Sequence, residues 1–254
     1  MLIIVDHKIS SGAKKKLSRF GELMEIQTHG ITYPAISGHP DIFFCQSPGC
    51  LFVAPNLPGK YFEMLKKHRI EYITGELPAG NEYPDTARYN AVATDKYLIH
   101  NFRHTDPVIR DSIPTHRDSI PTHRDSIPTH RDSIPVPCSS TLARLQVEQG
   151  YTRCNLLPLR EGHFITSDEG IFNILQGRSP CVIYINPLEI KLEDFPHGFF
   201  GGCCGVLESM VFINGSLWYH PDGHKIRDFL ESLHYEIIEL SDGQLTDVGS
   251  VLFV

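Results

Sequence analysis

Acidic, histidine and cysteine side chains recur in this sequence within short glycine- or proline-containing segments. The segments are GHPD at 38–41, YPDTARYN at 83–90, TSDEG at 166–170, HGFFGGCC at 197–204 and DVGS at 247–250. A carboxylate can accept two hydrogen bonds from a planar guanidinium group. A cysteine thiolate can attack the central carbon of such a group, while a histidine transfers the proton. The pattern therefore favours a pocket for a small guanidine- or amine-type cation.

The candidate site residues come from these segments. The expected substrate-binding residues are Asp41, Asp85, Asn90, Asp168, Asp247 and Ser250. The expected catalytic residues are Cys203 and Cys204 as alternative nucleophiles and His39 and His197 as alternative acid–base groups. Two structural alternatives stay open. Asp168 in SDEG is also typical of a helix cap. The glycines beside Cys203 and Cys204 would equally allow close packing in a crowded interior.

Two groups of residues could suggest a metal site. His116, His123 and His130 recur at a fixed spacing, but no shell of fixed ligands surrounds them. Cys203, Cys204, His197 and His220 form the second group, and adjacent cysteines fit one tetrahedral zinc poorly. We therefore expect neither a metal nor another cofactor.

One structural unit, a hairpin followed by a helix and a strand, repeats along the chain. In residues 198–240, apolar runs at 206–213 and 216–219 flank Asn214-Gly215, a strong hairpin signal. A helical spacing over 226–233 and a strand at 235–240 complete this unit. The other expected elements are strands 2–5, 22–27, 41–44, 51–54, 70–73, 89–93, 97–100, 151–157, 160–166, 181–185 and 248–254, and helices 10–20, 59–68, 141–148 and 169–176.

The repeated units predict the fold class. The last run, 248–254, has no helix behind it, and the first, 2–5, has no hairpin partner, so together they complete a fifth unit. Five such units predict a closed, fivefold pseudosymmetric α/β propeller made of one domain, residues 1–254. A generic α/β sandwich is the alternative. In the propeller, polar residues at the starts of the units would meet at the central axis.

Residues 110–135 contain the heptapeptide RDSIPTH three times, followed by RDSIP. A proline in every copy opposes a helix, and each copy offers only one isoleucine to a core. We expect this segment to be an extended loop inserted into the third unit.

Composition limits the partners. The net charge of −7 and the lack of a long basic run argue against a nucleic-acid surface. No apolar run approaches the roughly 20 residues that span a bilayer. Seven cysteines without a CxxC pair, and a start without a signal-peptide pattern, predict a cytoplasmic protein with free thiols. The expected partner is a small molecule, and the oligomeric state is left open.

Several motifs together resemble those of the pentein superfamily of guanidine-modifying enzymes, specifically an uncharacterised bacterial branch of it. They are GHPD, YNAVATDKYLIHN, QGYTRC, ITSDEGI, HGFFGGCCG, YHPDG and DVGS, and they cover nearly the whole chain outside the repeats. The superfamily includes arginine deiminases, dimethylarginine dimethylaminohydrolases and amidinotransferases. The resemblance implies a Cys-His-carboxylate mechanism through a covalent thiouronium intermediate.

The sequence departs from that pattern near its end. The enzymes carry a pattern like G-S-x-H-C there, whereas Gly249-Ser250-Val251 is followed here by Leu252 and Phe253. We therefore expect a pentein-like protein that binds a cation in an acidic, histidine-containing pocket, with catalysis left uncertain. The alternative is a Cys-dependent C–N hydrolase or amidinotransferase, in which Asp41 and Asp168 hold the cation.

Overall fold

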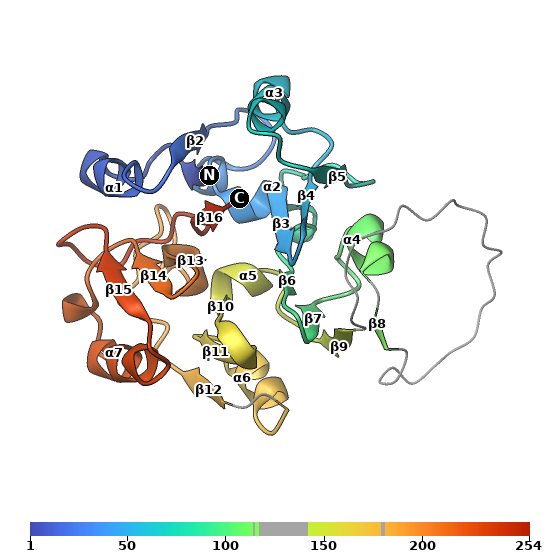
Figure 1. Cartoon of the computed structure of the whole chain (residues 1–254). Helices are drawn as coiled ribbons and strands as arrows, with labels where there is room; N and C mark the ends of the chain where they lie inside the picture. The colour runs from blue at the N-terminus through green and yellow to red at the C-terminus, as the bar shows by residue number, and fades with distance from the viewer. Residues whose placement is uncertain (114, 117–141, 179–180) are drawn as a thin grey trace.

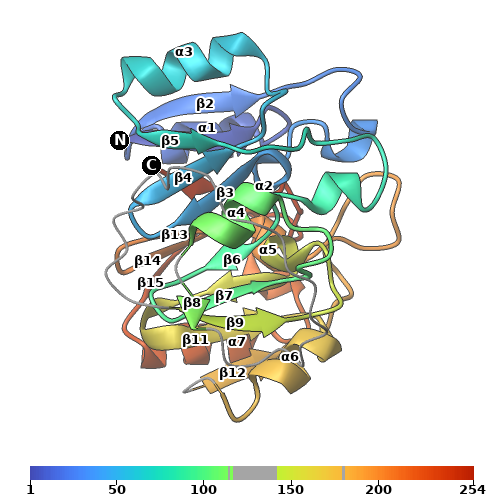
Figure 2. The ribbon, with the colours of Figure 1, turned by 90° about the vertical axis from the view of Figure 1, so that its right-hand side faces the viewer.

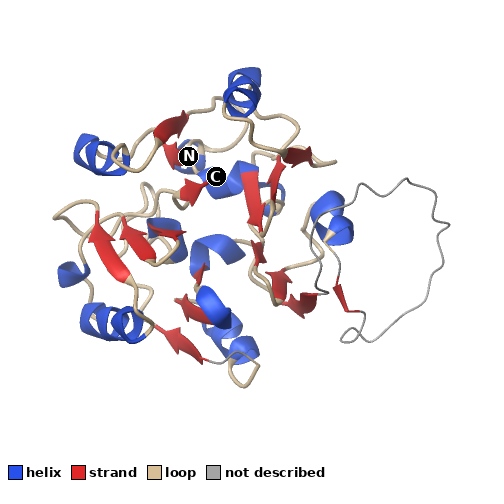
Figure 3. Ribbon diagram, viewed as in Figure 1, coloured by secondary structure: helices blue, strands red, loops and turns tan. Residues whose placement is uncertain are grey.

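Five small β-sheets form the framework of the described part of the chain (Figures 1 and 3). The computed structural model describes residues 1–113, 115–116, 142–178 and 181–254. In every sheet the first two strands are antiparallel, and a later strand returns parallel to the second after a helix. This is the predicted hairpin–helix–strand unit.

The first sheet joins the two ends of the chain. Strand β1 (Leu2–Asp6) lies between β16 (Leu252–Phe253) and β2 (Glu22–Ile26). Ile3 faces Phe253 across the antiparallel pair and Leu23 across the parallel pair. The predicted fifth unit, built from both ends of the sequence, is therefore confirmed.

The remaining four sheets follow in chain order. They are β3 (Phe44–Ser47), β4 (Cys50–Val53) and β5 (Tyr72–Thr74); β6 (Val92–Ala93), β7 (Tyr97–His100), β9 (Leu142–Gln146) and β8 (Thr115–His116); β10 (Leu156–Pro158), β11 (His163–Thr166) and β12 (Cys181–Tyr184); and β13 (Cys204–Leu207), β14 (Met210–Ile213) and β15 (Glu236–Glu239). Each is an open sheet, so the fold is α/β with five repeated sheets, and the closed propeller stays a prediction.

Longer helices lie on the outside and short ones near the centre (Figure 1). The outer helices are α1 (Ser11–Leu17), α3 (Gly59–Lys67), α4 (Pro107–Ser112), α6 (Glu169–Leu175) and α7 (Gly223–Ser232). The inner ones are α2 (Pro40–Phe43), α5 (Thr152–Asn155) and the 3-10 turn η4 (Gly201–Cys203). The other 3-10 turns are η1 (Pro34–Ile36), η2 (Asp85–Ala87), η3 (Arg160–Gly162) and η5 (Leu217–Tyr219). Figure 2 shows the assembly from the side, with α3 above and α6 below.

Apolar residues at helical spacing attach the outer helices to the sheets. Helix α3 buries Tyr61 and Leu65, and α7 buries Ile226 and Leu230, each pair four residues apart on one face. The Ser10 hydroxyl accepts a hydrogen bond from Ala13 N at 3.1 Å and so caps α1. These local signals explain why the sequence predicted α1, α3, α6 and α7, whereas α4 was not predicted.

Phe212 holds the first and fifth sheets together. It is fully buried, and its ring lies 4.9 Å from that of Phe20 and 4.8 Å from that of Phe253. We expect Phe212→Ala to lower the free energy of unfolding by about 3–5 kcal/mol, because both the apolar contacts and the filled volume are lost. Chemical denaturation measures this change. The half-exposed Phe195 is the control, and a loss for Phe212→Ala no larger than for Phe195→Ala would contradict the assignment.

The hairpin predicted around Asn214-Gly215 is wrong. The hairpin instead joins β13 to β14, and its turn lies at residues 208–209, where Glu208 has φ +51°. Gly215 does have positive φ, but the Asn214 amide donates to Thr246 O at 2.9 Å, so the pair leads out of the sheet. Residues 217–219 then form η5 and not a strand. The local turn signal was real, but it did not specify which runs pair.

Four other expected segments are also different. Residues 142–146 are a strand and not a helix, because β9 pairs with β7 on one side and β8 on the other. The segment 41–43 belongs to helix α2, with Pro40 in its first turn, and 152–155 to helix α5. Helix α4 extends to Ser112, so the first residues of the predicted 110–135 loop are helical.

Residues 117–135 of the repeated segment lie outside the described residues. The part of the chain that the structure describes contains no helix long and apolar enough to cross a membrane.

Candidate functional site

Most residues of the candidate site lie shortly before the first strand of a sheet, and Asp6, the last residue of β1, is the exception. Helix α2 precedes β3, Asn90 precedes β6, α5 precedes β10, η4 precedes β13, and Ser250 precedes β16. These turns bring side chains from distant parts of the sequence together at the centre of the molecule. The prediction that unit starts converge agrees with this placement.

Asp41 lies at the centre of a buried hydrogen-bonded group. Its Oδ2 accepts hydrogen bonds from Ser250 Oγ at 2.8 Å and from the Cys154 thiol at 3.0 Å. The Asn90 side-chain amide donates to the Asp41 carbonyl at 3.0 Å and accepts from Cys154 N at 3.1 Å. The other carboxylate oxygen of Asp41 is buried and has no hydrogen-bond partner among the described residues.

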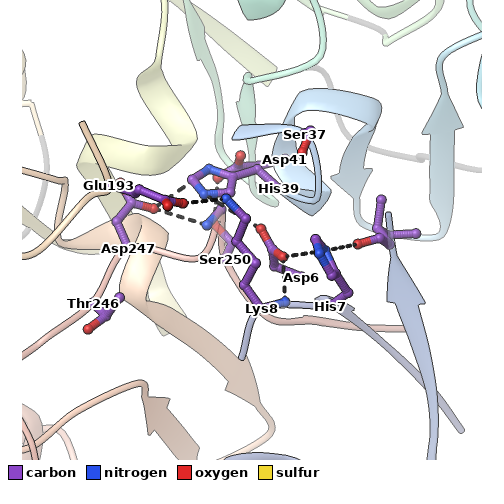
Figure 4. A network of polar contacts seen from close by, with 12 residues as sticks. Asp6, His7, Lys8, Ser37, His39, Asp41, Glu193, Thr246, Asp247 and Ser250 are labelled. Carbon is purple, nitrogen blue, oxygen red and sulfur yellow. Dashed lines mark hydrogen bonds and ion pairs between the residues drawn. The ribbon is translucent and has the colours of Figure 1, made fainter. Parts of the chain in front are cut away.

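A second group lies beside the first (Figure 4). The His39 ring stands between two buried carboxylates, with Nε2 3.8 Å from Asp6 Oδ2 and Nδ1 3.9 Å from Asp247 Oδ1. Both distances exceed a hydrogen bond, so His39 is directly bonded to neither carboxylate. Asp247 accepts hydrogen bonds from Phe199 N at 2.9 Å and Gly249 N at 3.0 Å.

Asp6 is held through only one of its carboxylate oxygens. Lys8 N donates to Asp6 Oδ1 at 2.8 Å, while Oδ2 is buried and has no hydrogen-bond partner among the described residues. Such a group is uncommon in native structures, because an unpaired buried oxygen loses its hydration without replacement. Asp6 Oδ2 and Asp41 Oδ1 are therefore acceptors left for a water molecule or a ligand.

Burial disfavours charge throughout this cluster. Burial raises the pKa of Asp6 and of Asp41, and burial together with the nearby Asp41 charge raises the pKa of Asp247 to about 7. Burial lowers the pKa of His39 to about 3, so its imidazole is neutral. A cation placed between these carboxyls would favour their ionised form.

Two cavities reach the cluster and share His39 and Asp247. A cleft of about 250 Å³ is also lined by Asp6, Lys8 and Glu193. A cavity of about 20 Å³, enough for one water-sized group, continues on the other side of His39. Its wall includes Tyr33, Tyr151, Cys154 and Phe199.

Three predicted site residues lie elsewhere. Asp168 accepts a hydrogen bond from Ile171 N at 2.8 Å and so caps α6. This is the structural alternative given above for the SDEG motif. Asp85 forms an ion pair with Arg88 and is half-exposed. His197 lines neither cavity, and its ring contacts that of Phe199. The structure brings together His39, Asp41, Asn90, Asp247 and Ser250.

Both predicted nucleophiles face the apolar core. Cys203 and Cys204 are fully buried and pack in one hydrophobic cluster with Phe200 and Val211. Burial raises the pKa of both thiols. Leu252 and Phe253, which replace the expected His and Cys, are used in β16 to pair with β1.

Asp6 and Cys154 are site residues that were not among those predicted from the sequence. Asp6 ends a fully buried apolar strand, and a carboxylate at such a position was a usable signal. Cys154 sits in the motif QGYTRC, where its contact with Asp41 depends on packing between α5 and α2. No local pattern indicates that contact.

No group of three or more potential metal ligands gathers among the described residues. His123 and His130 lie outside the described residues, as does the side chain of His116.

The comparison with protein families identifies the relationship of this chain. A sequence model described as a family of unknown function, DUF6873, matches residues 4–122 and 136–252. The chain belongs to this family. The unmatched residues 123–135 lie within the repeated RDSIPTH segment, so the DUF6873 match continues on both sides of it. A comparison with curated proteins finds no match.

Solved structures show which fold the DUF6873 chain has. One is a dimethylarginine dimethylaminohydrolase adduct with 4-chloro-2-hydroxymethylpyridine, at 12% identity and TM-score 0.51. Another is the same enzyme from Pseudomonas aeruginosa in complex with citrulline, at 11% identity and TM-score 0.53. Each alignment covers 94% of this chain and 91% of the other. The enzyme is a pentein, so the predicted superfamily is confirmed at the level of the fold.

Proposed function

We propose that this protein binds a small organic cation of the guanidine or amine type at the cluster of Asp6, His39 and Asp247. The observation that carries the proposal is Asp6 Oδ2, a buried and unpartnered acceptor on a residue that lines the cleft. A guanidinium would donate to this oxygen and to Asp247 in place of water. Charge-assisted hydrogen bonds of this kind are about twice as strong as neutral ones.

The surroundings of the cleft also suit a cation. Tyr33, Tyr151 and Phe199 line the adjoining cavity, and aromatic faces attract cations that have lost water. The Lys8 ammonium, which could compete for the site, donates to Glu193 at 2.7 Å and to Pro34 O at 3.0 Å. Its charge is therefore partly neutralised at the edge of the cleft.

The structural neighbours support an amino-acid-derived ligand. The enzyme's name states that it acts on dimethylarginine, and one structure holds citrulline. A cleft of about 250 Å³ is slightly below the usual range of ligand sites, which begins at about 300 Å³, so the ligand is small.

We further propose that residues 1–254 form one domain in which the five sheets close into a propeller. Cytoplasmic location and the absence of nucleic-acid partners stay predictions.

The alternative, a Cys-dependent hydrolase or amidinotransferase, needs a thiolate at the cation. Cys154 is the thiol that lines the small cavity, and burial together with the Asp41 charge raises its pKa well above the ordinary value. A thiol in this state is a poor nucleophile. The geometry therefore favours binding without thiol catalysis.

Labelling separates the two functions. We expect chloroacetamidine, an amidine electrophile, to leave Cys154, Cys203 and Cys204 unmodified in the native protein, because none of them reaches solvent as a thiolate. Peptide mapping by mass spectrometry identifies the modified residues, and the partly exposed Cys181 serves as an internal control with iodoacetamide. Rapid stoichiometric labelling of any of the three buried thiols would support the enzyme instead.

The raised pKa of Asp247 makes cation binding depend on pH. Since this carboxyl has a pKa of about 7 without ligand, it is protonated at lower pH and must lose its proton to face a cation. We expect the Kd for methylguanidine to rise about tenfold for each pH unit below about 7, and to level off above it. Isothermal titration calorimetry measures this.

Methylurea, which has the shape of methylguanidine without its charge, is the matched control ligand. Its weaker binding should not change over the same pH range. Equal affinities for the two ligands, or tighter binding of methylguanidine at acidic pH, would contradict the proposed function.

A further inference from the structure

A further cavity lies among the first strands of all five sheets and shares no lining residue with the cleft or the small cavity. Its volume is about 320 Å³, within the range of small-molecule sites. The strands β3, β6, β10, β13 and β16 contribute Gln46, Ala93, Pro158, Val206 and Leu252 to its wall. The cavity is thus formed by strands of all five sheets together.

Arg153 of α5 is the only charged side chain among the described residues that line this cavity. Its Nη1 donates to Gly201 O at 2.9 Å and its Nη2 to Cys204 O at 3.3 Å. A guanidinium has five N–H donors and stays charged in proteins. The described residues thus accept two hydrogen bonds from Arg153, both through neutral carbonyls.

The charge of Arg153 has no direct counter-ion in the described part of the chain. No described carboxylate lies within ion-pair distance of it, although the more distant Asp41 charge favours its protonated form. Burial has the opposite effect and lowers its pKa. A partly buried cation with unused donors beside a cavity is a recognition element for a planar anion.

We propose that this cavity binds a small organic carboxylate through Arg153. The planar carboxylate matches the fork of the guanidinium, and the apolar side chains of Val206, Val251 and Leu252 would contact a short alkyl chain. Gln46 adds an amide at the wall and is itself exposed. The ligand class is therefore a short-chain monocarboxylate, and the site is independent of the cation site proposed above.

Propionate is the probe, and propionamide, the neutral molecule of the same shape, is its control. We expect saturation-transfer NMR with native protein to show saturable binding of propionate and none of propionamide. Arg153→Gln should weaken propionate binding at least about tenfold, since charged hydrogen bonds are lost. Because Arg153 is partly buried, this variant can fail to fold, and a pair of further variants is needed.

Gln46→Glu and Gln46→Lys form that pair, because this side chain is exposed. Its Nε2 donates to Phe253 O at 2.7 Å, a hydrogen bond that a lysine ammonium can also donate and a carboxylate cannot, so the fold of each variant is checked by its Tm. We expect about threefold weaker propionate binding in Gln46→Glu and about threefold tighter binding in Gln46→Lys. Methylguanidine titrations of both variants should match the native protein, which separates the two sites. Equal signals from propionate and propionamide, or identical propionate affinity in both variants, would overturn the proposal.

Discussion

Replacing Asp6 by asparagine should weaken methylguanidine binding about a hundredfold at about pH 8, because a buried charged partner is removed. Asparagine has the same shape and can keep the hydrogen bond that Asp6 Oδ1 accepts from Lys8 N. It puts an amide, which is a donor, where the unpartnered Oδ2 stands. The loss is thus confined to the cation site, and titration calorimetry measures it.

The same change should not destabilise the fold. Burial raises the pKa of Asp6, so the folded state favours its protonated form. The contribution of Asp6 to stability is therefore greatest at low pH and falls as the pH rises through its raised pKa. Asp6→Asn removes an ionised buried group at alkaline pH, and its Tm there should equal or exceed that of the native protein.

Glu193→Gln is the matched control for Asp6→Asn. Glu193 lines the same cleft, but its side chain is 64% exposed and pairs with Lys8. An exposed pair of this kind contributes at most about 1 kcal/mol, so methylguanidine affinity should change by less than about fivefold. If Asp6→Asn bound methylguanidine as well as Glu193→Gln does, Asp6 would not belong to the site.

Gly249→Ala should lower the free energy of unfolding by about 3 kcal/mol and abolish methylguanidine binding. Gly249 has φ +64°, and a Cβ there would run into the side chain of His39. Its N donates to Asp247 Oδ1 at 3.0 Å and its O accepts from Asp41 N at 3.1 Å. Any backbone shift that relieves the clash would therefore displace His39 and the side chains of Asp41 and Asp247.

Gly243→Ala is the control for that substitution. A Cβ at Gly243 meets nothing within 4 Å, so the change should stay within about 0.5 kcal/mol. Urea denaturation of both variants makes the comparison. A Gly249→Ala protein as stable as Gly243→Ala, with binding intact, would show that the turn before β16 does not position His39.

The repeating units could be predicted from sequence because their signals are local. Tyr61 and Leu65 of α3 have helical spacing, and β4 is bounded by Pro48-Gly49 on one side. Strand pairing is not local, and this is why residues 142–146 form β9 despite their helix-like pattern. For the same reason, the last hairpin forms between β13 and β14 and not around Asn214-Gly215.

The candidate site was predictable in part for a related reason. His39, Asp41, Asn90, Asp247 and Ser250 precede inner strands, so recognising the units was enough to bring them together. Asp168 occupies an equivalent-looking motif, but it is used as a helix cap. The roles of Asp6 and Arg153 depend on which oxygen or N–H lacks a partner after folding, and sequence patterns do not contain that information.

The most direct test of the cation site is the protonation state of its carboxyl groups, measured by ¹³C NMR of the aspartate side chains at about pH 6. Our proposal predicts a protonated Asp247 in the free protein that becomes ionised when methylguanidine is added, with a matching change at Asp6. Methylurea should leave both signals where they are. Unchanged carboxyl signals at saturating methylguanidine would contradict the proposed function.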